Sequence, residues 1–387
     1  MEGVALADLA QLAVLGTGGR SVVKLCAPCD ADAAHADASV PVCNAARWQR
    51  PFFALKAIPR RAVSDPRRAA QVFAERDALR ALAPHPRIVE LLRTLKDDAN
   101  LYFVLGFVAG GDLHRHLRGA PARGGAAAGT FAPARARFYA AEVCSALAHM
   151  HAAGFLHRDV KANNVRLDAA GHVKLVDLGF VRRLGAGGGG GTDAARAHTF
   201  CGTPHAMAPE VAALRPGGGG AAAGYGPAAD RWSLGVLTFE MLTGLPPFWC
   251  TDRDVRTGSP EFNAAVFTQI EAADVDVLLA PIAVLDGGAS GGTDDGGGTD
   301  GARAFVRALL ERDPARRLAA AALAAHAWWG AGGLDAVLAT SPPAFDVQHT
   351  DFDLAGMHDD GGVTDGEEDG GEALGEAEQA LFDDFGL

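Results

Sequence analysis

The stretch His157-Arg158-Asp159-Val160-Lys161-Ala162-Asn163-Asn164 places a carboxylate, an ammonium group and an amide close together in the chain. A second carboxylate follows in Asp177-Leu178-Gly179, directly after a strand-like apolar run. Phosphoryl transfer requires an aligned hydroxyl, metal ions on the phosphates and positive charge for the developing negative charge. Asp159 can accept a proton from a hydroxyl, and Lys161 can reach the transferring phosphate. Asn164 and Asp177 offer the oxygen atoms that Mg²⁺ prefers.

This wording and order resemble the catalytic and metal-binding loops of the protein kinases. The resemblance implies an α+β, bilobal protein-kinase fold, with a small antiparallel β lobe that carries helix C and a larger, mostly helical lobe. It implies ATP and Mg²⁺ as cofactors, with Asp159 and Lys161 as catalytic residues and Asn164 and Asp177 as metal ligands. The expected reaction is transfer of the ATP γ-phosphate to Ser or Thr of proteins.

A glycine-rich segment, Leu15-Gly16-Thr17-Gly18-Gly19-Arg20-Ser21-Val22-Val23, lies between two β-rich runs. Glycines let backbone N–H groups approach phosphates closely. Phe53-Ala54-Leu55-Lys56 follows on the next strand, and the pair resembles the kinase Gly-rich loop and strand lysine. The resemblance implies a set of nucleotide-binding residues: Leu15, Gly16, Thr17, Gly18, Gly19, Ser21, Val23, Ala54, Lys56, Glu75, Leu105 and Asp112.

Residues 66–82 have helical composition and carry Glu75 at the position of the helix-C glutamate. By the resemblance, Glu75 pairs with Lys56 and orients it on the nucleotide phosphates. Residues 101–108 form a continuous apolar run around one glycine, which predicts a buried strand. Leu105 in this run resembles the gatekeeper of the adenine pocket, and Asp112 is placed to contact ribose or a basic substrate residue.

The segment Thr199-Phe200-Cys201-Gly202-Thr203-Pro204, followed by Ala208-Pro209-Glu210, narrows the resemblance. Its wording is similar to that of the AGC group of serine/threonine kinases, and within that group to the cyclic-nucleotide-dependent kinases. In this family pattern Glu210 pairs with Arg317. Asp230, at the start of a later helix, is a buried carboxylate that braces the backbone of the catalytic loop.

Thr199 matches the activation-loop phosphorylation site of the AGC group, which predicts an upstream activating kinase as a partner. A phosphate there would add about −1.5 to −2 charge and three strong acceptors. Arg158 and Arg182 are the candidate partners of that phosphate. The glycine-rich insertion at residues 185–191 predicts that the unphosphorylated segment is largely disordered.

The resemblance also bears on substrate preference. Relatives place a glutamate where Asn163 stands and use it to bind an arginine near the acceptor. Asn163 is neutral and cannot form a charge-assisted pair, whereas Asp112 and Glu240 remain as acidic contacts. We therefore expect a basophilic enzyme with a weakened demand for arginine two residues before the acceptor.

Three departures from the family pattern fall in the nucleotide- and metal-binding segments: Ser21 replaces the third glycine of the loop, Gly106 replaces a hinge glutamate, and Leu178 replaces the phenylalanine of D-F-G. They support an alternative, a catalytically silent scaffold with the kinase fold. Silent relatives usually lack the lysine, the catalytic aspartate or the metal-binding aspartate, and all three are present here. The sequence therefore favours an active enzyme.

The composition of the 387-residue chain excludes some classes of partner. Its net charge of −12 comes from the end of the chain, because residues 351–387 hold thirteen Asp or Glu and no Lys or Arg. A nearly neutral body with an acidic tail argues against nucleic-acid binding. No apolar run approaches the roughly 20 residues of a membrane span, and the first residues do not predict a secretory signal peptide. We expect a soluble cytoplasmic monomer that acts on protein substrates.

Three regions are expected: residues 1–108 as the N-lobe and hinge, 109–330 as the C-lobe, and 331–387 as a partly disordered acidic tail. Phe382 and Phe385 have the spacing of the hydrophobic motif with which AGC tails bind the N-lobe. The same residues fit an acidic segment that lies over the nucleotide site in relatives, and a plain acidic tail is the third alternative.

The six cysteines are scattered, which suits a reducing compartment. Cys26 and Cys29, with His35 and Cys43 nearby, have some features of a zinc site. The spacing after the first pair is irregular, and the region resembles an insertion. The sequence therefore favours an incidental loop over zinc binding.

Overall fold

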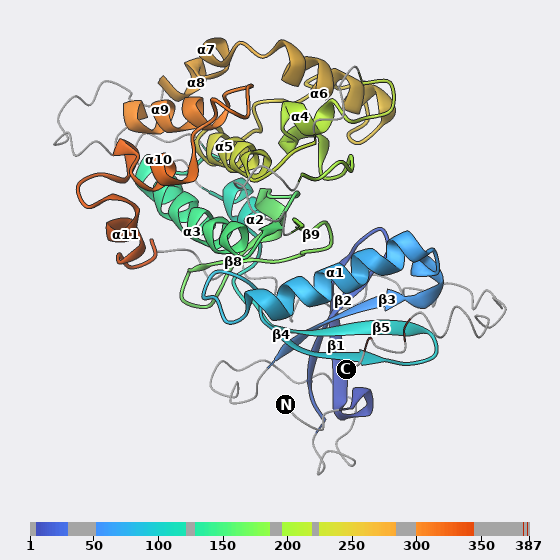
Figure 1. Cartoon of the computed structure of the whole chain (residues 1–387). Coiled ribbons are helices and arrows are strands. Elements are labelled where there is room, and N and C mark those ends of the chain that lie inside the picture. Colours follow the sequence, from blue (N-terminus) through green and yellow to red (C-terminus); the bar gives the residue numbers. More distant parts are fainter. Residues whose placement is uncertain are drawn as a thin grey trace. The chain divides into compact units, whose positions relative to one another are not determined.

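The computed structural model describes residues 5–29, 52–120, 128–185, 196–218, 224–283 and 299–343, together with Phe382 and Phe385. These residues belong to two compact units (Figure 1). The first unit comprises residues 1–84, 89–109 and 347–387, and the second comprises residues 85–88 and 110–346. The end of the tail thus belongs with the N-terminal unit, although most of the second unit separates them in the sequence.

The first unit is built on a five-stranded antiparallel sheet in the order β1-β2-β3-β5-β4. Its strands are β1 (Leu9–Thr17), β2 (Val22–Pro28), β3 (Phe53–Pro59), β4 (Leu91–Lys96) and β5 (Asn100–Gly106). The one long helix described in this unit is α1 (Pro66–Leu82). Asp65 caps it by accepting a hydrogen bond from the amide of Arg67 (3.0 Å), and Pro66 fits the first turn, where no N–H partner is needed.

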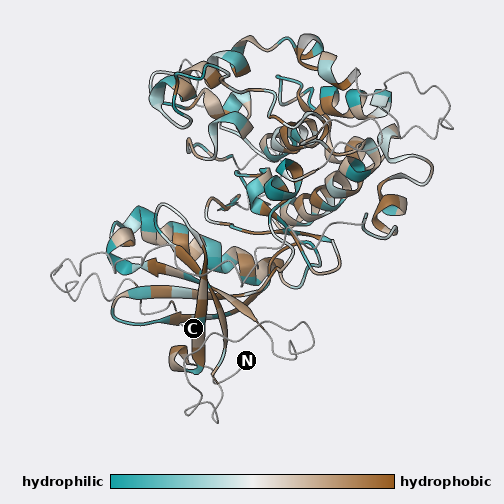
Figure 2. Cartoon of the chain, turned by 180° about the vertical axis from the view of Figure 1, so that it is seen from behind, coloured by the Kyte–Doolittle hydropathy of each residue, from teal (hydrophilic) through white to brown (hydrophobic). Residues whose placement is uncertain are grey.

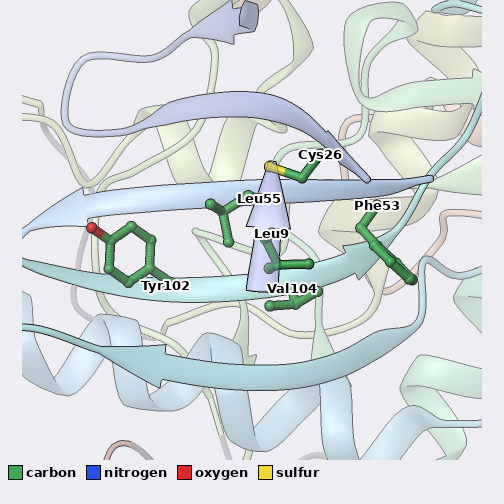
Figure 3. Close-up of a cluster of buried hydrophobic side chains, with 6 residues drawn as sticks. All are labelled: Leu9, Cys26, Phe53, Leu55, Tyr102 and Val104. Carbon is green, nitrogen blue, oxygen red and sulfur yellow. The ribbon is translucent and has the colours of Figure 1, made fainter. Parts of the chain in front are cut away.

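Successive side chains of β3 and β5 point to opposite faces of this sheet, as the two-residue period of a strand requires. One face carries the apolar cluster drawn in Figure 3, which comprises Leu9, Cys26, Phe53, Leu55, Tyr102 and Val104. The other face carries Lys56, whose ammonium group meets Glu75 of α1. The helix buries its own apolar side, and Figure 2 shows a more hydrophilic ribbon for α1 than for the strands. The sheet therefore has a helix-covered face and a separate apolar face.

The second unit is mainly helical, with α3 (Pro133–Ala152) and the almost wholly buried α5 (Ala228–Thr243) packed together. Its other α-helices are α2 (Leu113–Arg118), α4 (Pro209–Ala212), α6 (Pro260–Ala272), α7 (Val275–Leu278), α8 (Ala280–Ala283), α9 (Thr299–Leu309), α10 (Ala320–Ala324) and α11 (Gly333–Leu338). A small sheet in one unit and a larger helical unit confirm the expected bilobal α+β class.

Two short antiparallel strand pairs hold the polar loops of the second unit. They join β6 (Phe155–Leu156) to β9 (Arg182–Arg183), and β7 (Val165–Leu167) to β8 (Val173–Leu175). The stretch 157–164 runs from β6 to β7, and Asp177 lies between β8 and β9. The two strand pairs therefore bring the two carboxylate-bearing loops to the same region of this unit.

Candidate functional site

One buried carboxylate fixes the backbone of the loop that follows β6. Asp230, at the start of α5, accepts hydrogen bonds from the amides of His157 (2.9 Å) and Arg158 (2.8 Å) and contacts Nε2 of His151 at 2.7 Å. Burial acts to raise the pKa of Asp230, but the His151 contact and the amide donors outweigh burial and lower it. Arg158, whose amide donates to this carboxylate, adopts a left-handed backbone conformation (φ +70°). The expected brace is therefore present.

Asp159 lies at the centre of a buried polar network. Its Oδ1 accepts a hydrogen bond from Thr203 Oγ1 (2.6 Å), and its Oδ2 accepts from Asn164 Nδ2 (2.9 Å). The ammonium group of Lys161 lies 2.9 Å from Oδ2 and donates to Thr203 Oγ1 (2.7 Å). Asp159 is only 2% exposed. The network fixes the carboxylate and the ammonium group side by side.

Asn164 and Asp177 present oxygen atoms in the same unit. Asn164 uses its Nδ2 group to donate to the carbonyl and carboxylate of Asp159, both at 2.9 Å, which leaves the amide oxygen as its metal-binding atom. The main-chain carbonyl of Asn164 accepts a hydrogen bond from the main-chain amide of Val176, the residue before Asp177 (3.0 Å). Asp177 is exposed and has φ +58°. A carboxylate and an amide oxygen are ligands that suit Mg²⁺, so this donor set fits the expected metal.

The first unit contains the expected ion pair. Lys56 Nζ lies 2.7 Å from Glu75 Oε1, and the two residues are 8% and 4% exposed. The sheet register places Val23 opposite Lys56, and Ala54 opposite Leu105. The pairing of Lys56 with Glu75 is therefore confirmed, and these predicted nucleotide-binding positions share neighbouring strands.

The remaining predicted nucleotide residues lie at the β1–β2 turn and in the second unit. Leu15, Gly16 and Thr17 end β1, and the amide of Gly18 donates to the carbonyl of Ser21 (2.7 Å), which closes the turn. Gly19, between them, is exposed.

Asp112, in the second unit, uses its Oδ1 to cap α2 by accepting from the amide of Arg115 (2.9 Å). Asp112 therefore has a structural role at the start of α2, and its contact with ribose or a substrate stays a prediction.

Glu210 forms the second ion pair expected from the sequence. Its two carboxylate oxygens accept from Nη1 and Nη2 of Arg317 at 2.6 and 2.9 Å. Arg317 is 2% exposed and also donates to the carbonyl of Ala228 in α5 (2.8 Å). A bidentate pair of this kind fixes both position and orientation, and it ties the A-P-E segment to the helical core.

The region of Thr199 differs from the expectation of disorder. Residues 186–195 lie outside the part of the chain that the structure describes, but residues 196–203 have defined contacts, including an antiparallel bridge between Ala197 and Tyr225. Arg158 is a predicted partner of a phosphate on Thr199. In the structure it donates hydrogen bonds to the carbonyls of Phe180 and Val181 and to the hydroxyl of Tyr225. Arg182, the other candidate partner, is exposed in β9.

Glu240, which the sequence suggested as an acidic contact for the substrate, is buried. Glu240 is 6% exposed, and its Oε1 lies 3.6 Å from Nδ1 of His114. The nearby Glu240 carboxylate raises the pKa of His114, against the opposite effect of burial. Asn163 is exposed and neutral. The carboxylate that the sequence suggested for binding arginine is therefore buried and lies next to a histidine.

The tail returns to the first unit through two aromatic side chains. Phe382 and Phe385 are both fully buried. Phe385 makes edge contacts with Phe73 of α1 and Phe103 of β5, with ring centroids at 5.8 and 5.3 Å, and Phe382 stacks on Phe73 at 6.4 Å. The carbonyl of Phe382 also accepts from Lys96 Nζ (3.1 Å). Of the three alternatives, these contacts favour the hydrophobic motif that binds the N-lobe.

Two residues of the candidate zinc site, Cys26 and Cys29, lie in the part of the chain that the structure describes, and neither supports metal binding. Cys26 belongs to the apolar cluster, and burial raises the pKa of its thiol to about 11. Cys29 Sγ contacts the carbonyl of Ala7 at 3.5 Å. His35 and Cys43 lie outside the described residues.

Sequence reasoning missed two residues of the network. Thr203 was noted only as part of a T-P motif, yet its hydroxyl joins Asp159 to Lys161. Tyr225 was not singled out, although its hydroxyl contacts Arg158 and the backbone of Thr199. The T-F-C-G-T-P motif could have indicated a role for Thr203 in the site, whereas no local sequence pattern indicates one for Tyr225.

Comparison with known proteins identifies relatives of the chain. A family model described as "Protein kinase domain" matches residues 38–329. Serine/threonine-protein kinase Sgk3 of Rattus norvegicus is 38% identical over 201 residues, which cover 52% of this chain and 36% of that protein. Human serine/threonine-protein kinase Sgk2 is 37% identical over 201 residues, covering 52% and 49%.

A third relative, "cAMP-dependent protein kinase, catalytic subunit-like" of Caenorhabditis briggsae, is 37% identical over 196 residues, covering 51% of this chain and 44% of that protein. The matches thus span half or less of each relative's length. The names confirm the resemblance to AGC-group serine/threonine kinases. In the described residues, no helix is both long and apolar enough to cross a membrane.

Proposed function

Because the chain belongs to the protein kinase family, we propose that it transfers the γ-phosphate of ATP to serine or threonine hydroxyls of protein substrates. The observation that carries this proposal is the buried network in which Asp159 is held by Asn164 and Thr203 beside the ammonium group of Lys161. A fixed acceptor beside a fixed positive charge is what phosphoryl transfer requires of the protein.

We assign a separate task to each group. Asp159 accepts the proton of the substrate hydroxyl and orients it. Lys161 stabilises the negative charge that develops on the transferring phosphoryl group. Thr203 holds these two side chains in their relative positions through its hydroxyl.

The cofactor-binding assignments follow the donor chemistry. Lys56, held by Glu75, is proposed to bind the α- and β-phosphates, and Asn164 and Asp177 to bind Mg²⁺. Bound Mg²⁺-ATP supplies the phosphoryl group and neutralises its charge. The other proposed nucleotide contacts are Leu15, Gly16, Thr17, Gly18, Gly19, Ser21, Val23, Ala54, Leu105 and Asp112.

The partners and setting are proposed from composition and from the relatives' family. We propose protein substrates, an upstream kinase acting at Thr199, and a cytoplasmic monomer that binds neither nucleic acid nor membrane. The charge distribution supports the absence of nucleic-acid binding, because the basic side chains outside the tail are matched by acidic ones.

Removal of the Asp177 carboxylate is expected to abolish Mg²⁺-dependent stabilisation by ATP. At a hundredfold excess over Kd, a ligand that binds only the folded state stabilises it by about 2.7 kcal/mol. A thermal-shift titration with Mg²⁺-ATP should therefore show a shift for the parent and none for Asp177→Ala. Asp254→Ala is the matched control, since Asp254 is an exposed carboxylate in the same unit. An unchanged shift in Asp177→Ala would remove this residue from the metal site.

Substrate selection is expected to be weakly basophilic. Glu240 is paired with His114 and Asn163 carries no charge, so neither offers a free carboxylate to an arginine two residues before the acceptor. A positional peptide-library scan should show no strong selection at that position. His114→Ala should raise selection for basic residues there, by about tenfold if Glu240 forms a new charge-assisted pair. Strong arginine selection by the parent chain would contradict this account of Glu240.

A further inference from the structure

Tyr225 is buried where two parts of the second unit meet. It is 2% exposed and lies directly before α5. Its amide donates to the carbonyl of Ala197 (2.9 Å), and its carbonyl accepts from the amide of Ala197 (2.8 Å). Gly224 before it has φ +69°, and a Cβ there would lie 2.6 Å from Cε1 of His198. The backbone thus holds residues 196–198 firmly against residues 224–225.

The hydroxyl of Tyr225 joins two loops of the proposed site. It donates to the carbonyl of Thr199 (2.8 Å) and accepts from Nη1 of Arg158 (3.1 Å). Cys201 Sγ lies 3.7 Å from the same oxygen. Burial raises the pKa of Tyr225 and also that of Cys201, so both groups stay protonated near neutral pH. The phenol can therefore donate to one loop while it accepts from the other.

Arg158 extends this connection to the loop that follows Asp177. Its Nε donates to the carbonyl of Phe180 (2.5 Å) and its Nη2 to the carbonyl of Val181 (3.5 Å). Gly202 has φ +110°, and a Cβ there would lie 2.5 Å from the Arg158 carbonyl, so the activation segment crosses the catalytic loop closely. A continuous chain of contacts therefore runs from Thr199 through Tyr225 and Arg158 to the loop after Asp177.

We propose that the Tyr225 hydroxyl is a positioning group that holds the activation segment and the Asp177 loop together through Arg158 when Thr199 carries no phosphate. This inference rests on the proposed kinase function. Tyr225 acts through other residues and contacts no reacting group in the described network. Its bond to a charged guanidinium is of the stronger class of hydrogen bonds.

A phosphate on Thr199 would perform the same task by another route. It would add acceptors for arginine side chains next to the carbonyl that Tyr225 now holds. The hydroxyl is therefore needed most in the unphosphorylated chain and least in the phosphorylated chain. This dependence on phosphorylation distinguishes positioning from a general contribution to folding.

The kinetic test compares Tyr225→Phe with the parent in two states, phosphatase-treated and phosphorylated on Thr199, each verified by mass spectrometry. In the unphosphorylated state we expect Tyr225→Phe to lower kcat about tenfold and to change KM for ATP by less than about twofold. Phosphorylation should reduce the loss to less than about threefold. An equal loss in both states, or none in the unphosphorylated state, would overturn the proposal.

The matched control is Tyr139→Phe. The Tyr139 side chain is fully buried in the same unit, and among the described residues its hydroxyl makes no hydrogen bond to a loop of the proposed site. The variant reports the cost of removing a buried phenolic oxygen that does not join two loops. Its kcat should match that of the parent in both states.

A second measurement does not depend on catalysis. Backbone amide hydrogen exchange of the unphosphorylated, ATP-free chain should speed up in Tyr225→Phe over residues 178–183 and 196–203, and not in Tyr139→Phe. If the parent transfers no phosphate, the proposed function fails, and exchange alone still decides the role of Tyr225. Unchanged exchange in both segments would overturn the positioning role whatever the activity.

Discussion

Asp159→Asn is expected to lower kcat by roughly 10²–10⁴-fold and to leave the affinity for ATP within about twofold of the parent value. The amide keeps the shape of the side chain and can still accept from Thr203, but it cannot take a proton from a substrate hydroxyl. Lys161, 2.9 Å from Oδ2, would also lose its charged partner. Steady-state kinetics and calorimetric ATP binding measure the two effects separately.

The control for this variant is Asp168→Asn, in the same unit. Asp168 accepts from the amides of Ala170 and His172 in the β7–β8 turn, and so has a purely local role. Its kcat should stay within about twofold of the parent value. Equal turnover by Asp159→Asn and the parent would mean that Asp159 is not the catalytic carboxylate.

The second large effect is expected from Asp230→Ala, which should lower the free energy of unfolding of the second unit by about 3–5 kcal/mol. Asp230 is 1% exposed, and its removal leaves the amides of His157 and Arg158 buried without an acceptor. An unpaired buried donor loses its solvation and gains nothing in return. Asp230→Asn, which keeps one carbonyl oxygen, should lose less stability.

Denaturant unfolding followed by tryptophan fluorescence measures this effect. Trp232, Trp249, Trp328 and Trp329 all lie in the second unit, so the signal reports mainly on that unit. Asp254→Ala, an exposed change, should stay within about 0.5 kcal/mol of the parent. A loss from Asp230→Ala no larger than this control would show that the carboxylate does not brace the loop.

Local sequence signals predicted the elements whose causes are local. The helix expected at residues 66–82 is α1 (Pro66–Leu82), because an aspartate cap and a proline in the first turn fix its start. The buried strand expected at 101–108 ends earlier, at Gly106, which pairs with Phe53, the first residue of β3, so β3 offers no partner beyond it. The ends of elements thus depend on neighbours that the local sequence does not show.

The family resemblance predicted three long-range pairs, Lys56 with Glu75, Glu210 with Arg317, and Asp230 with the catalytic-loop backbone. Sequence motifs can predict such pairs because each partner occupies a recognisable position within a motif.

Motif wording could not predict the pairing of Glu240 with His114 or the contacts of Tyr225. Those contacts depend on which side chains folding brings together from distant parts of the second unit.

The central claim, that this chain is an active serine/threonine kinase, is tested most directly by incubating the purified chain with Mg²⁺ and ATP labelled on the γ-phosphate, together with a degenerate serine/threonine peptide library. The account predicts label on serine or threonine, dependence on Mg²⁺, and its loss in Asp159→Asn. Binding of Mg²⁺-ATP with no label transferred by the Thr199-phosphorylated chain would contradict the claim and favour a silent kinase-fold scaffold.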